Sequence, residues 1–310
     1  MLPPPAPLLR WPGGKTSLLS LLLNRIERLC PAGLQGDYFE PFLGGGTLFF
    51  ALAHSPLTAE RRSRPGPWAH LSDVSPEIIG LYKAVQAEPD EVWRHLSTLV
   101  ARYSAARDHE QRKAIYLAER DQLNWAIQTG RAHGPVHGGR VIFLSKTNFN
   151  GLWRVNQGKR DPERGGTYNV PHGRPSGKGP SFPSLREILS ASAALDGATL
   201  RLASYSPAFA QMTEGDLLFA DPPYGGVQGH VKFVEYALGG FSAAEQRWLC
   251  LLLWDAHRRG VRSLVTNGDF PGNRAAYAHA GLCVETTAES RAINVDTTAR
   301  KAVDCLLGWG

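Results

Sequence analysis

The sequence predicts an α/β fold: a doubly wound, mostly parallel sheet with an inserted domain of helices and a hairpin. Short apolar strands alternate with helices near both ends of the chain, which is typical of parallel sheets. A cluster of three glycines follows the first strand, and the segment 81–185 interrupts the alternation. Ligands of such sheets bind beyond the carboxyl ends of the strands.

Each element follows from its local pattern. Strands are expected where short apolar runs lie between turn residues: 38–42, 69–73, from about 199, 217–220 and 264–266. Helices are expected where apolar residues recur every three or four positions or where a cap precedes such a run: from Thr16 or Ser17 to 29, 47–53, from Ser75, and from Ser242, whose Glu245 completes a capping box.

The middle of the chain differs from both ends. Residues 81 to 130 have helical periodicity throughout, whereas 145–183 are rich in Gly, Asn, Arg, Lys and Pro and suit a long exposed hairpin or loop. We therefore predict a sheet domain formed by 1–80 and 186–310, with an insertion over 81–185.

Composition narrows the class of protein. With 310 residues, 43% hydrophobic and 20% charged, the chain is an ordinary globular protein. It lacks a signal-peptide pattern, and its leucine-rich runs are too short to cross a bilayer, so we expect a cytoplasmic protein with no membrane contact. The net charge of +6 suits a polyanionic partner without deciding it. Four widely spaced cysteines indicate buried, reduced thiols and no metal site.

The sharpest motif is Asp221-Pro222-Pro223-Tyr224, directly after an apolar strand. An exocyclic amino group of a nucleobase is a poor nucleophile because its lone pair is delocalised into the ring. The Asp221 carboxylate and the Pro222 carbonyl can accept its protons, and Tyr224 offers a stacking face for the base. The alternative is a proline turn that merely ends a strand.

The glycine turn at 44–46 lets the backbone approach a cofactor closely. A dinucleotide fingerprint would need glycine or alanine where Phe49 stands, so that interpretation fails. Asp73 ends the second strand, where it could bind ribose hydroxyls or cap the next helix. Gly14-Lys15-Thr16 matches the end of a phosphate-binding P-loop, but Leu9 stands where that motif needs glycine, which excludes it.

Several motifs in register resemble the Dam-type, class alpha, amino-directed DNA adenine methyltransferases. They are Trp11-Pro12-Gly13-Gly14-Lys15, Phe39-Glu40-Pro41-Phe42 with its glycines, Ser72-Asp73, the segments 149–156 and 168–174, Asp221-Pro222-Pro223-Tyr224, and 298–304. This resemblance implies a Rossmann-like methyltransferase sheet that carries the catalytic site. It also implies a DNA-recognition insertion, and methyl transfer from S-adenosylmethionine to a base flipped out of double-stranded DNA.

The resemblance also implies roles for individual residues. S-adenosylmethionine would contact Trp11, Lys15, Phe42, Gly44, Asp73 and Asp221. The target base would lie against Asp221, Pro222 and Tyr224. DNA would contact Arg10 at an outer base pair, Phe149 as a wedge, Asn150 at a phosphate, and Leu152, Arg154 and Pro171 at base edges. Phe149 and Trp153 could instead be core residues, as is favoured for Trp153, and Arg154 a solvated charge.

The pattern departs from the family in the specificity region. Gln157–Gly166 is longer and more charged than usual, Pro175 replaces an aromatic residue, and Ser145-Lys146 stands where Asn-Arg is common. The family's GATC target is therefore not carried over. Adenine N6 is favoured as the methylated position over cytosine N4, and RNA, protein or a vestigial DNA-binding module are the alternatives. We expect a monomer, and the sequence does not say whether it serves restriction-modification or housekeeping.

Overall fold

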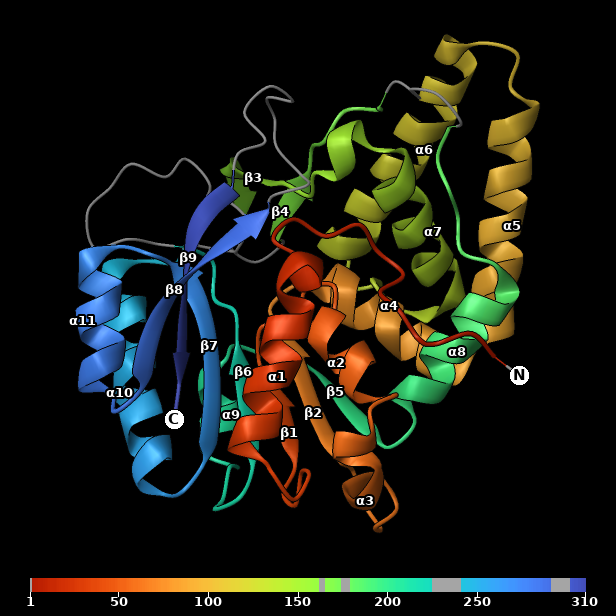
Figure 1. Cartoon of the computed structure of the whole chain (residues 1–310). Coiled ribbons are helices and arrows are strands. Elements are labelled where there is room, and N and C mark those ends of the chain that lie inside the picture. Colours follow the sequence, from red (N-terminus) through yellow and green to blue (C-terminus); the bar gives the residue numbers. More distant parts are fainter. Residues whose placement is uncertain (1, 162–164, 174–178, 225–240, 291–301) are drawn as a thin grey trace.

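The computed structural model describes residues 2–161, 165–173, 179–224, 241–290 and 302–310. Its centre is a seven-stranded sheet in the order β5-β2-β1-β6-β7-β9-β8 (Figure 1). The first five strands of this order are parallel, and β9 runs antiparallel to both β7 and β8. The strands are β1 Tyr38–Glu40, β2 Ala69–Asp73, β5 Ala198–Leu202, β6 Leu217–Ala220, β7 Arg262–Gly268, β8 Cys283–Ser290 and β9 Ala302–Trp309.

Helices cover both faces of the sheet (Figure 1). They are η1 Lys15–Leu18, α1 Leu19–Leu29, α2 Thr47–Leu52, η2 Pro56–Thr58, α3 Ala59–Arg62, α4 Pro76–Ala87, α8 Leu185–Leu195, α9 Ser206–Phe209, α10 Ala243–Arg258 and α11 Pro271–His279. Successive strand residues point to opposite faces. Tyr38, Phe219 and Leu264 join the core under α1, α2 and α4, whereas Phe39 and Val265 join the core under α9, α10 and α11.

The insertion consists of three long helices and a hairpin, which lie to one side of the sheet in Figure 1. They are α5 Pro89–Ala105, α6 His109–Gln128, α7 Gly134–Thr147, the short helix η3 Phe149–Gly151, and the strands β3 Val155–Asp161 and β4 Gly165–Tyr168. One continuous core includes Val92 and Leu96 of the insertion together with Leu71 of the sheet. The division into 1–80 with 186–310 and 81–185 stays a prediction.

The predicted α/β architecture is confirmed, including every predicted strand and the helical stretch after residue 81. Three details were wrong. Thr16 and Ser17 do not cap the first helix, because both lie inside η1 and the N-cap positions of η1 and α1 are Gly14 and Leu18. The hairpin is confined to 155–168, because α7 continues to Thr147 with Ser145 buried. Ser242 accepts the backbone N–H of Glu245, but the reciprocal bond of a capping box forms at Ser184 and Glu187 instead.

The cysteine prediction is partly confirmed. All four thiols are free, and Cys30 and Cys305 are buried. Cys250 is only half-buried and Cys283 is exposed, so the expectation of four buried thiols was wrong. No helix in the described part of the chain combines the length and apolarity needed to cross a bilayer.

Candidate active site

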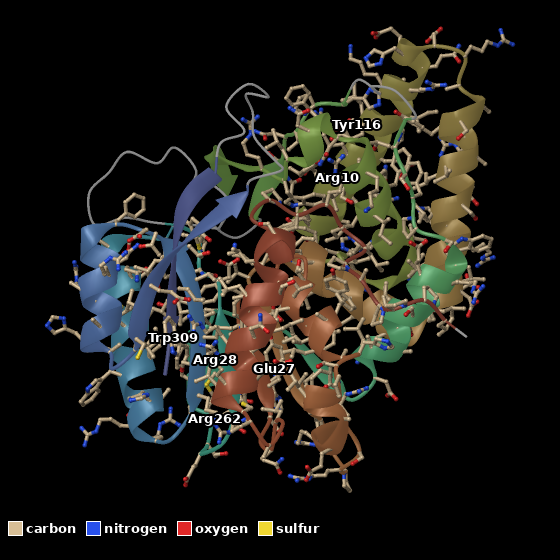
Figure 2. The ribbon with its side chains drawn as sticks, in the orientation of Figure 1. Arg10, Glu27, Arg28, Tyr116, Arg262 and Trp309 are labelled. Atoms are coloured by element: carbon tan, nitrogen blue, oxygen red, sulfur yellow. The ribbon has the colours of Figure 1, made fainter. Side chains whose placement is uncertain are left out.

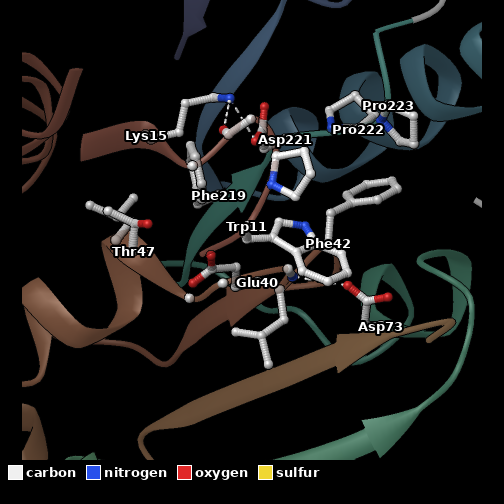
Figure 3. A pocket seen from close by; sticks show the side chains of 18 of the residues that line it. Trp11, Lys15, Glu40, Phe42, Thr47, Asp73, Phe219, Asp221, Pro222 and Pro223 are labelled. Atoms are coloured by element: carbon white, nitrogen blue, oxygen red, sulfur yellow. Dashed lines mark hydrogen bonds and ion pairs between the residues drawn. The ribbon is translucent and has the colours of Figure 1, made fainter. Parts of the chain in front are cut away.

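A cavity of about 810 Å³ opens where strands β1, β2 and β6 end (Figure 3). Three segments far apart in the sequence meet there: the N-terminal loop, the glycine turn and the strand end at Asp221. The predicted residues that line it are Arg10, Trp11, Lys15, Phe42, Gly44, Asp73, Asp221, Pro222 and Tyr224. The structure therefore brings the residues predicted to bind the cofactor and those predicted to bind the base into one cavity. This is expected because parallel strands place their carboxyl ends at one edge of the sheet.

Asp221 has a fixed environment on both carboxylate oxygens. The Thr266 hydroxyl of β7 donates to Oδ1 at 2.6 Å, and the Lys15 ammonium lies 2.8 Å from Oδ2. Lys15 is only 3% exposed, so this ion pair lies largely away from water. A charge held at such a site needs a partner of opposite sign, and each residue supplies it for the other.

Lys15 connects the N-terminal loop with the proposed base site. Its ammonium donates to the carbonyl of Gly13 at 2.6 Å and lies 5.0 Å from the centre of the Tyr224 ring. The Tyr224 hydroxyl in turn lies 3.3 Å from the Cys305 Sγ on β9. The Tyr224 ring is therefore held by the sheet at its hydroxyl group, and the Lys15 ammonium lies near the ring.

The glycine turn is shaped around Trp11. Gly44 has φ of +47°, and a Cβ at this position would lie 2.8 Å from the indole Nε1 of Trp11. Gly45 allows a similarly close approach, and its carbonyl accepts the hydroxyl of Tyr82 from α4 at 2.8 Å. Glycine is therefore needed here both for the left-handed backbone and for the contact with the indole.

Asp73 holds the glycine turn from the neighbouring strand end. Its Oδ2 accepts the backbone N–H of Gly44 at 2.9 Å, and its Oδ1 accepts that of Ser75 at 2.9 Å. Burial raises the pKa of Asp73, and the two backbone donors partly oppose this rise. The side chain combines both roles considered from sequence, because it bonds near the start of α4 and also lines the cavity.

Aromatic side chains form one wall of the cavity. Phe42 stacks on Tyr205 with ring centres 5.1 Å apart and meets the edge of Phe241 at 6.0 Å. Tyr205 and Phe241 were missed from sequence, since both stand in segments with no motif. Such a wall suits a flat heteroaromatic group.

Glu40 is a third missed residue, although it stands in the Phe39-Glu40-Pro41-Phe42 motif. It is 2% exposed, lines the cavity and accepts the Tyr38 hydroxyl at 2.8 Å. Burial, together with the negative charges of Asp221 and Asp73, raises the pKa of Glu40 to about 8 against the opposing hydrogen bond from Tyr38. An acid inside an apolar strand is the signal that could have revealed it.

Comparison with known proteins decides the family. The family model described as D12 class N6 adenine-specific DNA methyltransferase matches residues 11–290. The chain belongs to this family. It is therefore an adenine-specific DNA methyltransferase, and the cytosine alternative finds no support among these matches.

Individual relatives agree with the family. A DNA N-6-adenine-methyltransferase of Escherichia phage P1 is 30% identical over 97% of this chain, which spans about a third (35%) of that protein's length. A type II methyltransferase of Methanocaldococcus jannaschii is 26% identical over 95% of both chains. The DNA adenine methylase of Escherichia coli K12 is 27% identical over 96% of this chain and 93% of its own.

The residues expected to meet DNA lie mostly on the methyltransferase's surface. Phe149 is 37% exposed, Asn150 has φ of 54°, and Pro171, whose carbonyl accepts the Phe149 N–H at 2.9 Å, is exposed. Arg154 is exposed and donates to the Asn169 side chain at 2.9 Å. Phe149 and Asn150 belong to η3, Arg154 directly precedes β3, and Pro171 follows β4.

Leu152 and Trp153 differ from these neighbours. Leu152 is 9% exposed and Trp153 2%, and both belong to the main core. Trp153 stacks near Tyr168 and donates to Glu77 at 3.2 Å, so the core interpretation favoured for it is confirmed. The structure offers little of the Leu152 side chain to a partner.

Arg10 lies on the N-terminal loop beside the inserted helices (Figure 2). Burial lowers the pKa of Lys146, near the end of α7, and the positive charge of Arg10 lowers it further. Two cations thus lie close together next to the cavity. Residues 298–301, Arg174 and Pro175, which were also considered from sequence, lie outside the described residues.

Proposed function

We propose that the methyl donor is S-adenosylmethionine and that the substrate is an adenine flipped out of double-stranded DNA. The single observation that carries this proposal is the shared cavity of Asp221, the glycine turn and Asp73. A donor pocket and a base pocket must adjoin, because methyl transfer needs the two reacting atoms within about 3–3.5 Å of each other.

The residues around the glycine turn fit S-adenosylmethionine. A cavity of about 810 Å³ is large enough for a nucleoside with an amino-acid tail. The Asp73 carboxylate suits ribose hydroxyls, the Phe42 wall suits the adenine ring, and Trp11 packs on Gly44 at the lining of the same cavity. Lys15 would hold the carboxylate end. When bound, the donor supplies a methyl group on a positively charged sulfur, which is open to attack by nitrogen.

Asp221, Pro222 and Tyr224 would activate the target amine. Each carboxylate oxygen can accept more than one hydrogen bond, so an amine can bind to Asp221 alongside Thr266 and Lys15. Acceptance of the amine protons by Asp221 and the Pro222 carbonyl favours a pyramidal nitrogen with an available lone pair. The same acceptors stabilise the positive charge that develops on this nitrogen, which then loses one proton to restore the neutral amine.

The insertion would flip the base and read the sequence. Unstacking a base costs a few kcal/mol, and an inserted aromatic side chain such as Phe149 offsets part of that cost. Arg10 and Arg154 could each donate two hydrogen bonds to guanine, Asn150 would contact a phosphate, and Pro171 a base edge. Because Leu152 is largely buried, we assign it to the packing that supports these residues and not to a contact with a base.

The electrostatics beside the cavity support a polyanionic partner. Arg10 and Lys146 repel each other in the free protein, and a nearby phosphate would relieve this repulsion. Phosphate contacts release counterions, so affinity for DNA should fall steeply as salt concentration rises. We propose that one monomer binds one site in this manner.

Methyl incorporation tests the proposal. Wild-type protein should transfer labelled methyl from S-adenosylmethionine to duplex DNA, with label at adenine N6. Asp221→Ala should abolish transfer, whereas Asp121→Ala, whose side chain is 72% exposed on α6, should leave it unchanged. Retained transfer by Asp221→Ala would refute the role of Asp221. Label found in RNA or protein alone would refute the assigned substrate.

A further inference from the structure

Thr266 lies beside Asp221 although the two are 45 residues apart. The parallel pairing of β6 with β7 places Ala220 opposite Val265, so the next residue of each strand is Asp221 and Thr266. The Thr266 hydroxyl donates to the Oδ1 of Asp221 at 2.6 Å, a length typical of a strong bond to a charged acceptor.

Packing alone does not explain a hydroxyl at this position. Thr266 is fully buried, and the two residues before it, Leu264 and Val265, are apolar and equally buried. Valine has nearly the shape of threonine and would fill the same space without a polar atom to satisfy. The specific property of Thr266 is therefore its bond to Asp221.

The strand that carries Thr266 is well suited to hold a side chain in place. β7 lies inside the sheet, between β6 and β9, with Thr266 opposite Leu307. The next residue, Asn267, is also fully buried and donates to the Tyr277 hydroxyl at 2.8 Å and to Gln246 at 3.1 Å. These bonds tie the end of β7 to α10 and α11 on one face of the sheet, so the hydroxyl has a rigid support.

Thr266 and Lys15, which both contact Asp221, differ in kind. Lys15 is the first residue of the short helix η1 and reaches Asp221 with a long side chain of several rotatable bonds, whereas Thr266 has a short side chain on an interior strand. We propose that Thr266 is a positioning residue of the methyltransferase, which fixes the rotation of the Asp221 carboxylate so that it meets the target amine. This inference rests on the proposed role of Asp221.

Loss of the hydroxyl should slow methyl transfer without weakening binding. In Thr266→Val the carboxylate keeps its charge and its Lys15 partner but loses the donor on Oδ1. A misplaced group at a reacting centre costs rate, and loss of one supporting contact typically lowers activity about 10- to 100-fold. Affinities for donor and DNA should stay within about threefold of wild type, because Thr266 is buried behind Asp221.

The test compares four variants by single-turnover transfer, calorimetric donor affinity and DNA affinity. Thr266→Val should slow the single-turnover rate roughly 10- to 100-fold, and Thr266→Ser, which keeps the hydroxyl, should restore most of it. Thr266→Ala is the second variant if valine disturbs the fold. Ser263→Ala is the matched control, since Ser263 is buried on the same strand and its hydroxyl has no hydrogen-bond partner among the described residues.

The outcomes separate this inference from the proposed function. A wild-type rate for Thr266→Val or Thr266→Ala would overturn it, as would equal losses for Ser263→Ala. A loss that appears only as weaker donor binding would mean a structural role and would also overturn it. Asp221→Asn measured alongside tests the proposed function, because an active Asp221→Asn refutes the role of Asp221 itself. An inactive Asp221→Asn with a fully active Thr266→Val refutes only the inference.

Discussion

The ammonium of Lys15 lies 2.8 Å from the Asp221 carboxylate, so the start of the short helix η1 and the end of strand β6 share one ion pair. This pair places a cation in contact with the group that we assign to the target amine. Each partner neutralises the other, and removal of one leaves a poorly solvated charge.

Lys15→Met should therefore impair both binding and stability. It keeps the aliphatic stem but removes the charge that we assign to the donor's carboxylate. We expect donor affinity to fall roughly tenfold or more, equivalent to about 1.4 kcal/mol, and the melting temperature to fall. Calorimetry and thermal unfolding measure both, with the exposed Lys113→Met as control. Unchanged donor affinity would remove Lys15 from the proposed donor site.

Asp73→Asn should loosen the glycine turn. The carboxylate accepts one backbone N–H on each oxygen, from Gly44 and Ser75, whereas an amide has a single acceptor oxygen and would set its NH₂ against one of these donors. We expect donor affinity to fall about 10- to 100-fold, or about 1.4–2.8 kcal/mol. Calorimetric titration with S-adenosylmethionine measures this. An affinity equal to wild type would leave Asp73 as a helix-start residue only.

Gly44→Ala should damage the site more than glycine replacement elsewhere. Alanine at φ of +47° is strained by about 1–2 kcal/mol, and its Cβ would also lie 2.8 Å from Trp11 Nε1. Gly66→Ala is the matched control, since Gly66 has φ of +86° and nothing within 4 Å of a Cβ. We expect both variants to lose stability but only Gly44→Ala to lose donor binding. Equal binding by the two would show that the indole contact is unimportant.

Local pattern and strand topology were enough to predict that Asp73 and Asp221 line one cavity. Asp73 and Asp221 each follow an apolar strand, and parallel strands end at one edge, so their meeting follows from connectivity alone. Thr266 was not predicted, because its role depends on strand register: a shift of one residue would turn it to the other face. Tyr205 and Phe241 likewise reach the cavity only through tertiary packing.

Helix α7 and strand β8 were not predicted from the sequence, and each omission has a physical reason. Helix α7 contains Gly138 and Gly139, which normally weaken a helix; here a Cβ on Gly139 would lie 3.0 Å from the backbone of α5, so the glycines permit close packing. Strand β8 lies at the edge of the sheet and contains many polar residues, so its sequence shows little alternation of apolar and polar positions. Tertiary contacts override local preference in both cases.

Glu40 predicts an unusual dependence of stability on pH. Its folded-state pKa is about 8 because of burial, above the ordinary value of 4.5, so the folded protein holds a proton that the unfolded chain releases between these values. Glu40 therefore contributes stability that is fully present below pH 4.5 and is lost as pH rises towards 8. The loss is at most about 1.4 kcal/mol per pH unit.

Glu40→Gln should flatten this part of the pH profile. The amide keeps the shape of the side chain but cannot ionise, so the free energy of unfolding should fall less between pH 5 and 8 than in wild type. Urea unfolding at several pH values measures it, with the exposed Glu110→Gln as control. Parallel profiles for Glu40→Gln and wild type would contradict a raised pKa at Glu40.

Phe149→Ala should separate base flipping from DNA binding. The ring is 37% exposed on η3 and belongs to neither core formed by the described residues, so its removal should cost the fold little. As a wedge, it would offset part of the few kcal/mol needed to unstack the target. We expect the fluorescence rise of 2-aminopurine at the target position to fall and transfer to slow about tenfold, with nonspecific DNA affinity changed less. Leu251→Ala, at another exposed apolar position on α10, is the control. An unchanged fluorescence rise in Phe149→Ala would mean that another residue fills the gap left by the flipped base. An equal loss of fluorescence rise and transfer rate in Leu251→Ala would indicate a general effect of surface truncation.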